Sequence, residues 1–413
     1  MTEKNKSIRN FPNSGNIPKL RFSEFTDEWE KYHLKEFAEK VNNKNNDNKI
    51  LTVFSNSAVQ GIVLQSDYFD KSIANKENLC GYYIVQPFDF VYNPRLSSNA
   101  EVGAMSVNKT NITGLVSPLY TVFRIKKNNI NIPFLEYLFK SKVWHHYLRS
   151  IANYGARDDR MNVKSEDFYN LPLTIPNFPE QSKVSIFLSL IETRIQTQKK
   201  IIEQLETLIK GVGYKLFNKK IRFKNAELSE FPSWESKKGN EVFLNISNKN
   251  HNSELQILAI TQDYGAIPRD LIDFQISVTD KSIESYKVVE KGDFIISLRS
   301  FQGGIEYSEY KGICSPAYII LRNKIEVNSY FYKYYFKSEF YIKQLNKKLE
   351  GIRDGKMISY SYFSDISLPF PSISEQTKIA NFLSSIQEKI ETEKKIFEKL
   401  ELQKKFLLTN LFV

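Results

Sequence analysis

Side chains that could perform catalysis or bind a metal are few in this sequence, and their spacing supports neither role. None of the histidines has the spacing of a metal-ligand pair: His33, His145, His146 and His251. Asp293 with Glu309-Tyr310-Lys311 imitates the acidic-x-Lys group of metal-dependent nucleases, but the other half of the chain has Asn108-Lys109 near the matching place. We therefore expect no catalytic residue and no metal site in this chain.

Motifs that bind cofactors are also missing from the sequence. It contains neither G-x-x-x-x-G-K-[ST] nor G-x-G-x-x-G, and Asn93-Pro94-Arg95 only begins like the Asn-Pro-Pro-aromatic motif of amino-methyltransferases. Cys80 and Cys314 are too few and too far apart for a disulfide framework or a thiolate metal site. We expect this chain itself to bind no cofactor.

Net charge points to binding rather than to catalysis. The 413 residues include 58 Lys and Arg against 47 Asp and Glu, a formal net charge of +11. This excess favours an anionic partner, either nucleic acid or an acidic protein face, although an ordinary basic composition gives the same numbers. No stretch approaches the roughly 18 apolar residues of a membrane span, and the N-terminus lacks the apolar core of a signal peptide. We predict a soluble cytoplasmic protein.

A series of short motifs occurs twice along the chain, in the same order. The pairs are KLRFSEF with KIRFKNA, FDFVYNPR with GDFIISLR, GLVSPLY with GICSPAY, YLFKS with YFKS, and GARDDRM with GIRDGKM. Each series ends in a long helical pattern, PEQSKVSIFLSLIETRIQTQKKIIEQLE in the first half and SEQTKIANFLSSIQEKIETEKKIFEKLE in the second. The sequence is therefore a tandem duplication.

Each half is predicted to combine short strands and a helix before its long helix. The strands, rich in β-branched and aromatic residues, are expected at residues 51–54, 82–85, 88–92, 120–125, 257–260, 293–298 and 318–321. The shorter helices are expected at residues 133–151 and 330–349. This mixture predicts an α+β fold in each half.

The long helices carry apolar residues at alternating steps of four and three, the pattern of a coiled-coil seam. The seam residues are Val184, Leu188, Ile191, Ile195, Gln198, Ile202 and Leu205 in the first helix and Ile379, Leu383, Ile386, Ile390, Glu393, Phe397 and Leu400 in the second. Gln198 and Glu393 are the polar members, at equivalent places, and are candidate register markers. We expect the helices to pair in an antiparallel manner between two globular domains related by pseudo-twofold symmetry. The alternative is that each helix only covers its own domain. Gly211-Val212-Gly213 leaves open whether the first helix breaks.

The duplicated Glu-Gln-x-Lys tetrapeptide, with the S-P-x-Y and G-x-R-D-x-x-M pairs, resembles the specificity subunits of type I restriction-modification systems across nearly the whole chain. The resemblance implies two target recognition domains, each reading one half of a split DNA sequence, and two conserved spacer helices that set the spacing and dock methyltransferase subunits. The expected boundaries are 1–17 for a flexible N-terminal segment, 18–176 and 218–371 for the recognition domains, and 177–217 and 372–413 for the spacer helices.

The resemblance also implies which partners supply the chemistry. In that family two modification subunits methylate adenine with S-adenosylmethionine, and restriction or motor subunits use ATP and Mg for translocation and cleavage. The specificity chain is non-catalytic, and its direct ligand is double-stranded DNA. Two other functions remain as alternatives: a coiled-coil scaffold without DNA specificity, and a free-standing nuclease or methyltransferase.

Residues shared by both halves cannot encode a difference between two half-sites. Arg95 and Arg299 are therefore candidates for phosphate contact, with a structural pair to Asp89 or Asp293 as the alternative. Arg157 and Arg353 are candidates for phosphate or base contact, with a pair to the following aspartate as the alternative. The S-P-x-Y motif is expected to begin a buried strand.

Base-reading residues are expected where the two halves differ. Asn and Gln bond adenine in a bidentate manner and Arg bonds guanine, although a polar loop residue often has no such role. The candidates are Asn56, Gln60, Gln65, Asn99 and Asn108 in the first half and Gln262, Tyr264, Arg269 and Gln302 in the second.

Overall fold

The computed structural model describes residues 8–10, 15–68, 76–152, 159–251, 254–272, 283–347 and 358–413. The chain forms two compact units: unit 1 comprises Met1–Thr197 with Phe397–Val413, and unit 2 comprises Gln198–Ile396. The boundary between the units falls inside both long helices, α5 (Phe178–Phe217) and α12 (Ile373–Asn410).

A four-stranded antiparallel sheet forms the centre of unit 1. In spatial order its strands are β4 (Ala38–Lys40), β11 (Thr121–Ile125), β8 (Phe90–Asn93) and β9 (Ala104–Val107). Phe90 and Phe123 lie opposite each other on neighbouring strands, and their rings stack with centroids 5.2 Å apart. Phe139 of helix α2 (Ile132–Lys140) meets both rings edge-on, so α2 covers this face of the sheet.

Two-stranded ribbons and short helices complete the described part of unit 1. The ribbons are β1 (Ile8–Asn10) with β2 (Leu20–Phe22), β3 (Glu30–His33) with β12 (Pro172–Ile175), β5 (Phe54–Ser57) with β6 (Gly61–Leu64), and β7 (Tyr83–Val85) with β10 (Gly114–Val116). The short helices are η1 (Leu34–Glu36), α1 (Gln65–Tyr68), η2 (Lys76–Gly81), α3 (His145–Ile151) and α4 (Ser165–Tyr169).

Unit 2 repeats this architecture in the same order along the chain. Its sheet consists of β14 (Phe243–Ile246), β21 (Ile319–Asn323), β18 (Phe294–Ile296) and β19 (Glu306–Tyr307). Its ribbons are β13 (Glu235–Lys238) with β22 (Ser367–Phe370), β15 (Leu258–Thr261) with β16 (Gly265–Pro268), and β17 (Lys287–Val289) with β20 (Gly312–Cys314). Its shorter helices are α6 (Gly239–Val242), η3 (Arg269–Leu271), α8 (Ser300–Gly303), α9 (Ser329–Phe336), α10 (Glu339–Lys347) and α11 (Tyr360–Ser364). The matching topology confirms the duplication and the α+β fold class.

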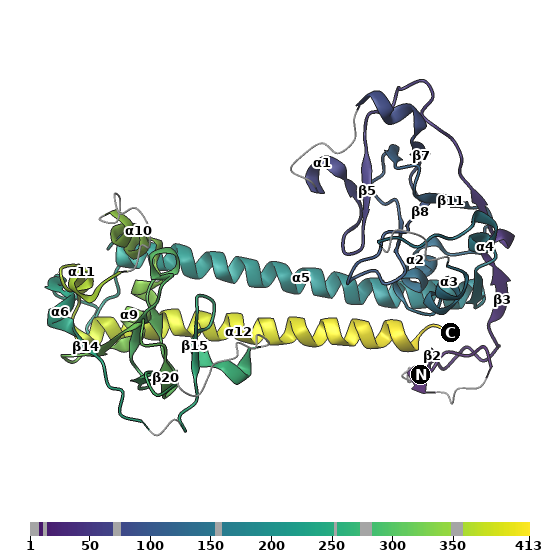
Figure 1. The fold of residues 1–413 in the computed structure, drawn as a ribbon. Helices are drawn as coiled ribbons and strands as arrows, with labels where there is room; N and C mark the ends of the chain where they lie inside the picture. Colours follow the sequence, from purple (N-terminus) through teal and green to yellow (C-terminus); the bar gives the residue numbers. More distant parts are fainter. Residues whose placement is uncertain are drawn as a thin grey trace. The chain divides into compact units, whose positions relative to one another are not determined.

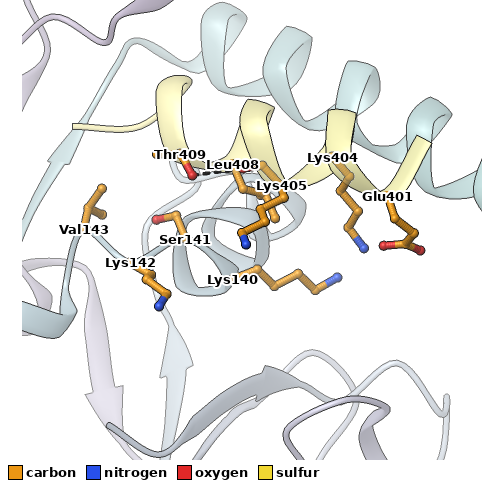
Figure 2. A pocket seen from close by; sticks show the side chains of 9 residues that line it. All are labelled: Lys140, Ser141, Lys142, Val143, Glu401, Lys404, Lys405, Leu408 and Thr409. Carbon is orange, nitrogen blue, oxygen red and sulfur yellow. Dashed lines mark hydrogen bonds between the residues drawn. The ribbon is translucent and has the colours of Figure 1, made fainter. Parts of the chain in front are cut away.

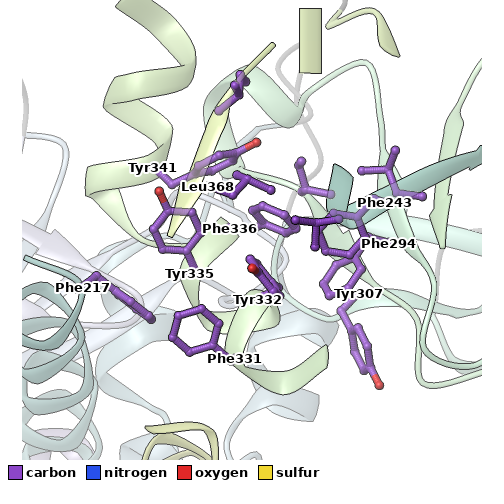
Figure 3. Close-up of a cluster of buried hydrophobic side chains, with 14 of the residues drawn as sticks. Phe217, Phe243, Phe294, Tyr307, Phe331, Tyr332, Tyr335, Phe336, Tyr341 and Leu368 are labelled. Carbon is purple, nitrogen blue, oxygen red and sulfur yellow. The ribbon is translucent and has the colours of Figure 1, made fainter. Parts of the chain in front are cut away.

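Aromatic side chains fill the core of unit 2 (Figure 3). Phe243 of β14, Phe294 of β18 and Phe336 of α9 have ring centroids 5.3 to 5.7 Å apart. Phe217, at the end of α5, packs against Tyr335 of α9 with centroids 5.4 Å apart. Burial of each such ring contributes about 1.5–3 kcal/mol, so the sheet, α9 and this end of α5 are held as one core.

The helices predicted at residues 133–151 and 330–349 are each broken in two, which corrects the prediction. Ser141 and Ser338 donate their hydroxyl hydrogens to the carbonyl three residues earlier, at 2.5 and 2.6 Å, and these bonds end α2 and α9. Trp144 is buried in the gap between α2 and α3, where its indole N–H bonds two main-chain carbonyls. A Lys-Ser dipeptide shared by both halves thus marks the break.

The long helices α5 and α12 lie side by side and antiparallel within each unit (Figure 1). In unit 1, Lys404 pairs with Glu192 at 2.9 Å. In unit 2, the Gln198 amide donates hydrogen bonds to the carboxylate and, at 3.2 Å, to the carbonyl of Glu393. Helix α5 continues without a break through Gly211 to Phe217, which settles the question that the glycines raised.

Most of the predicted seam residues are buried in the structure. They are Val184, Leu188, Ile191, Ile195, Gln198, Ile202, Ile379, Leu383, Ile390, Glu393 and Leu400, while Leu205, Ile386 and Phe397 are half-buried. Among the described residues, no helix combines the length and hydropathy that crossing a membrane requires.

Candidate nucleic-acid interface

Each unit carries one exposed β-hairpin at the place where the two halves differ in sequence. In unit 1 the hairpin β5–β6 turns through residues 58–60, and in unit 2 the hairpin β15–β16 turns through residues 262–264. Gly61 and Gly265 end the turns with φ of 72° and 71°, as three-residue hairpin loops require. The duplicated scaffold therefore presents two loops of the same shape.

The side chains at the hairpin tips differ between the units. Val59 and Gln60 stand at the first tip, with Val59 75% exposed, and Gln262 and Tyr264 stand at the second, with Tyr264 72% exposed. Glutamine can bond a base edge, and an exposed tyrosine offers an apolar ring with a polar end. The two tips therefore occupy equivalent positions in their units but expose different side chains, as recognition of two different half-sites would require.

Two of the predicted base readers are used by the fold instead. Asn56 is 3% exposed, and its amide donates to the carbonyls of Val91 at 2.7 Å and Ala104 at 3.0 Å. Asn108 is fully buried, and its amide bonds the carbonyls of Gln86 and Ile112 at 3.1 and 3.0 Å. Asn56 joins β5 to the sheet and Asn108 fixes a neighbouring loop, so we do not include these side chains in the interface.

Arg95 and Arg299 lie two and three residues after the ends of the equivalent strands β8 and β18, and both are exposed. The pairs with Asp89 and Asp293 that the sequence left open are not formed. Asp89 accepts two hydrogen bonds from Arg124, and Asp293 accepts two from Arg322, all at 2.7 to 2.9 Å. Within the described ranges, no ion pair is found for Arg95 or Arg299.

The tyrosine of each S-P-x-Y motif lies among arginines. Burial raises the pKa of Tyr120, and the charges of Arg95 and Arg160 oppose that increase. Burial likewise raises the pKa of Tyr318, against the charges of two arginines, Arg269 and Arg299. In each unit two guanidinium charges thus act on the pKa of a half-buried tyrosine, and positive charge of this kind is suited to phosphate oxygens.

The remaining predicted residues are spread over the same loops. Gln65 is half-buried at the start of α1, Asn99 is exposed after β8, and Gln302 is exposed on α8. Arg157 and Arg353 lie outside the described residues.

The prediction for the S-P-x-Y motif is confirmed, because Tyr120 and Tyr318 stand directly before strands β11 and β21 and pack against the core clusters of their units. Sequence reasoning missed Arg160. The sequence feature that could have indicated Arg160 is a basic residue before methionine in both halves, Arg160-Met161 and Lys356-Met357. In unit 1, the main chain of Arg160 pairs with that of Arg95. This pairing brings a segment far along the chain to the arginine loop, defined as the residues that carry Arg95 after β8 in unit 1 and Arg299 after β18 in unit 2.

The Glu-Gln pair at each helix start joins the long helix to its own domain. Glu180 and Arg21, 1% and 2% exposed, form two bonds of 2.7 Å. Gln181 accepts the backbone N–H of Asn131 at 2.8 Å. In unit 2, Glu375 and Arg222 form the equivalent bonds at 3.0 and 2.7 Å. The tetrapeptide thus fixes the direction in which each helix leaves its domain.

An open pocket in unit 1 is lined by four lysines and by no residue of the hairpin β5–β6 (Figure 2). Lys140 and Lys404 both bond Glu192, at 3.0 and 2.9 Å, and Lys142 bonds Glu101 at 2.8 Å. Burial alone would raise the pKa of Glu192, but the two lysines hold it at about 2. The positive charge of this pocket is thus largely compensated within the unit.

Across the described part of the chain, no cluster of three His, Cys, Asp or Glu side chains could hold a metal ion.

Known proteins resemble this chain in sequence over much of its length. Residues 223–402 match the family described as the type I restriction modification DNA specificity domain. A putative type I restriction enzyme MjaX specificity subunit from Methanocaldococcus jannaschii is 26% identical, with 96% of this chain and 95% of that protein covered. The type I restriction enzyme MjaVIII specificity subunit of the same organism is 28% identical over 60% of this chain and 63% of its own length.

Solved structures share the fold at low sequence identity. The type I restriction-modification system S subunit from M. genitalium has a TM-score of 0.54 and 16% identity, with 96% of this chain and 99% of that chain covered. A chain from a study of complex assembly and conformational transition of the type I R-M system has a TM-score of 0.57 and 16% identity, with 92% and 96% covered. Taken with the duplicated topology, these matches support the interpretation of this chain as a specificity subunit of a type I restriction-modification system.

Proposed function

We propose that this chain gives a type I restriction-modification complex its DNA sequence specificity, with each unit reading one half of a bipartite target. The observation that carries the proposal is the pair of hairpins: they occupy the same place in two units of one topology, yet they expose different side chains. A protein that read one sequence twice would gain nothing from this difference.

Two sets of residues take separate parts in the proposed recognition. Arg95 with Arg160, and Arg269 with Arg299, bind backbone phosphates and set the position of each unit on the duplex. The hairpin tips, with Gln60 in unit 1 and Gln262 and Tyr264 in unit 2, enter a groove and contact base edges. Asn99 and Gln302, exposed in neighbouring loops, extend the contacts.

The long helices offer surface for the catalytic partners. Ile186 and Leu190 of α5 are 61% and 63% exposed, and Leu402 and Phe406 of α12 are 66% and 57% exposed. In each pair the residues are one helical turn apart, so they form apolar stripes. We assign these stripes to the docking of modification subunits, which would supply the methyl transfer that this chain lacks the motifs to perform.

Mapping methylated adenines in the genome of a host, with and without this gene, tests the proposal. The partner subunits must be expressed in both strains. We expect one bipartite motif to lose its methylation when the gene is removed, and to regain it when the gene is returned. Unchanged methylation would contradict the proposal and favour a scaffold without DNA specificity.

A further inference from the structure

We propose that Lys337 is a positioning residue that sets the base preference of unit 2 alone. It does so by holding the hairpin β15–β16 against the arginine loop. The equivalent lysine of unit 1, Lys140, has a different task. This inference rests on the proposed function and adds a residue that decides how one half-site is read.

The two lysines occupy the same place in the duplicated sequence, in YLFKS and YFKS, directly before the serine that ends the helix. Lys140 bonds Glu136 at 2.9 Å and Glu192 at 3.0 Å, so it points to the long helix. Lys337 bonds the carbonyls of Gln262 at 3.1 Å and Gly303 at 3.0 Å, and the carboxylate of Glu306 at 2.5 Å. One shared side chain thus supports different elements in the two units.

Two exchanges remove the acidic partners of the lysine in unit 2. Glu136, one helical turn before Lys140, is matched by Lys333 before Lys337. Glu192 of α5 is matched by Gln387 of α12, because the Glu-Gln-x-Lys tetrapeptides align Glu180 with Glu375. No acidic group therefore remains at these two places to draw Lys337 toward the long helix.

A third exchange supplies a new acidic partner beside the hairpin. Ser106 of β9 stands opposite Val91, and Glu306 of β19 stands opposite Ile295 at the equivalent place in the sheet. The Glu306 side chain is 1% exposed, and its second oxygen has no hydrogen-bond partner among the described residues. Burial disfavours an uncompensated carboxylate, so Glu306 favours the placement of the Lys337 ammonium beside it.

The hairpins are anchored by different means as a result. In unit 1 the buried Asn56 amide ties β5 to the sheet. The hairpin registers match Asn56 with Ile260, which has no such amide. In unit 2 Lys337 anchors the hairpin instead. Its ammonium group donates three hydrogen bonds, and one of them goes to the carbonyl of Gln262 at the hairpin tip.

Lys337 also links the tip to the arginine loop. The Gln262 amide donates to the carbonyl of Arg299 at 3.3 Å, and Gly303 leaves room for the Gln262 side chain where a Cβ would approach it to 2.7 Å. The helix α8 that Lys337 contacts at Gly303 begins directly after Arg299. Loss of Lys337 therefore frees the tip relative to the residue assigned to phosphate.

The test compares Lys337→Met with the matched control Lys140→Met, each in the full chain expressed with its partner subunits. Adenine methylation is mapped at sites that differ from the wild-type motif by one base. We expect Lys337→Met to raise methylation about tenfold at sites altered in one half of the motif, the discrimination that roughly one base contact carries. We expect Lys140→Met to leave the base preference of both halves unchanged.

A purely structural role would lower total methylation without altering base preference, so the two roles give different results. Unchanged preference in Lys337→Met, or equal relaxation in both halves, would overturn the inference. If Lys337→Met abolishes methylation, Glu306→Gln decides, because it keeps the shape of the side chain and removes its charge. Relaxation in the same single half then supports the inference, and unchanged preference refutes it. Failure of the proposed function itself would appear differently, as a wild-type chain that directs no bipartite motif.

Discussion

Arg95 and Arg299 do not pair with the nearby aspartates, because arginines on a neighbouring strand bond those carboxylates instead. Asp89 and Asp293 lie close to them in sequence, but Arg124 of β11 and Arg322 of β21 reach the same carboxylates across the sheet. The sequence could not decide between these partners, because the choice depends on strand register. Once the register is known, the arginines after β8 and β18 are left facing solvent.

Glu306 makes the stability of unit 2 depend on pH. Burial raises the pKa of Glu306 to about 7, although Lys337 acts in the opposite direction. The folded state therefore favours the protonated acid. The resulting stabilisation is fully present below the ordinary value of 4.5 and is lost as the pH rises through about 7.

We expect Glu306→Gln to flatten this dependence. Between about pH 5 and pH 8 the melting temperature of the wild type should fall relative to that of the variant. Each unit of pKa shift corresponds to about 1.4 kcal/mol, and each kcal/mol to about 2–4 °C for a unit of this size. Thermal unfolding followed by circular dichroism over this pH range measures the difference. Parallel curves for the two proteins would contradict the raised pKa.

At the scale of elements, the Glu-Gln-x-Lys tetrapeptide is a joint between helix and domain. Its glutamate neutralises an arginine, which is buried in unit 1 and partly exposed in unit 2. Its glutamine accepts the backbone N–H of the asparagine that caps a domain helix, Asn131 before α2 and Asn328 before α9. Because both bonds form within the first turn of the long helix, small changes there alter the direction of the whole helix.

The Arg21–Glu180 pair gives a prediction for this joint. Glu180→Met alone leaves Arg21 buried without a counter-charge, and we expect it to destabilise unit 1 by about 3–5 kcal/mol. The double variant Arg21→Met/Glu180→Met should recover most of that loss, since two apolar side chains replace the pair. Urea unfolding of the single and double variants measures the coupling. Additive losses in the double variant would show that the two charges act independently.

The elements differed in how far the sequence could predict them. The long helices and their polar seam pair were predictable, because the heptad pattern repeats over the whole length of each helix. The break at Ser141 and Ser338 was missed, since hydrophobic periodicity continues across it. The hairpin anchors were also beyond prediction: Lys140 and Lys337 are identical in the repeat, and their partners are chosen by residues far away in the chain.

At the scale of the whole molecule, the duplication allows one recognition domain to change without the other. We expect that replacing residues 20–175 by another recognition domain will change only one half of the methylated motif. The incoming domain should carry the arginine and asparagine equivalent to Arg21 and Asn131, so that the joint to α5 is kept. Methylation mapping of the chimera measures the result. If both halves change, the assignment of one half-site to each unit is wrong.

Unit 1 is completed by residues that are made after unit 2. Phe412 packs against Phe134 with ring centroids 5.4 Å apart, and Lys404 joins Glu192. Residues 397–413 emerge from the ribosome only after residues 198–396 have been synthesised. While the second recognition domain is translated, the first therefore lacks residues 397–413, and the side of α5 that these residues contact stays uncovered. Because of this order of synthesis, unit 1 can be completed only after unit 2 has been synthesised.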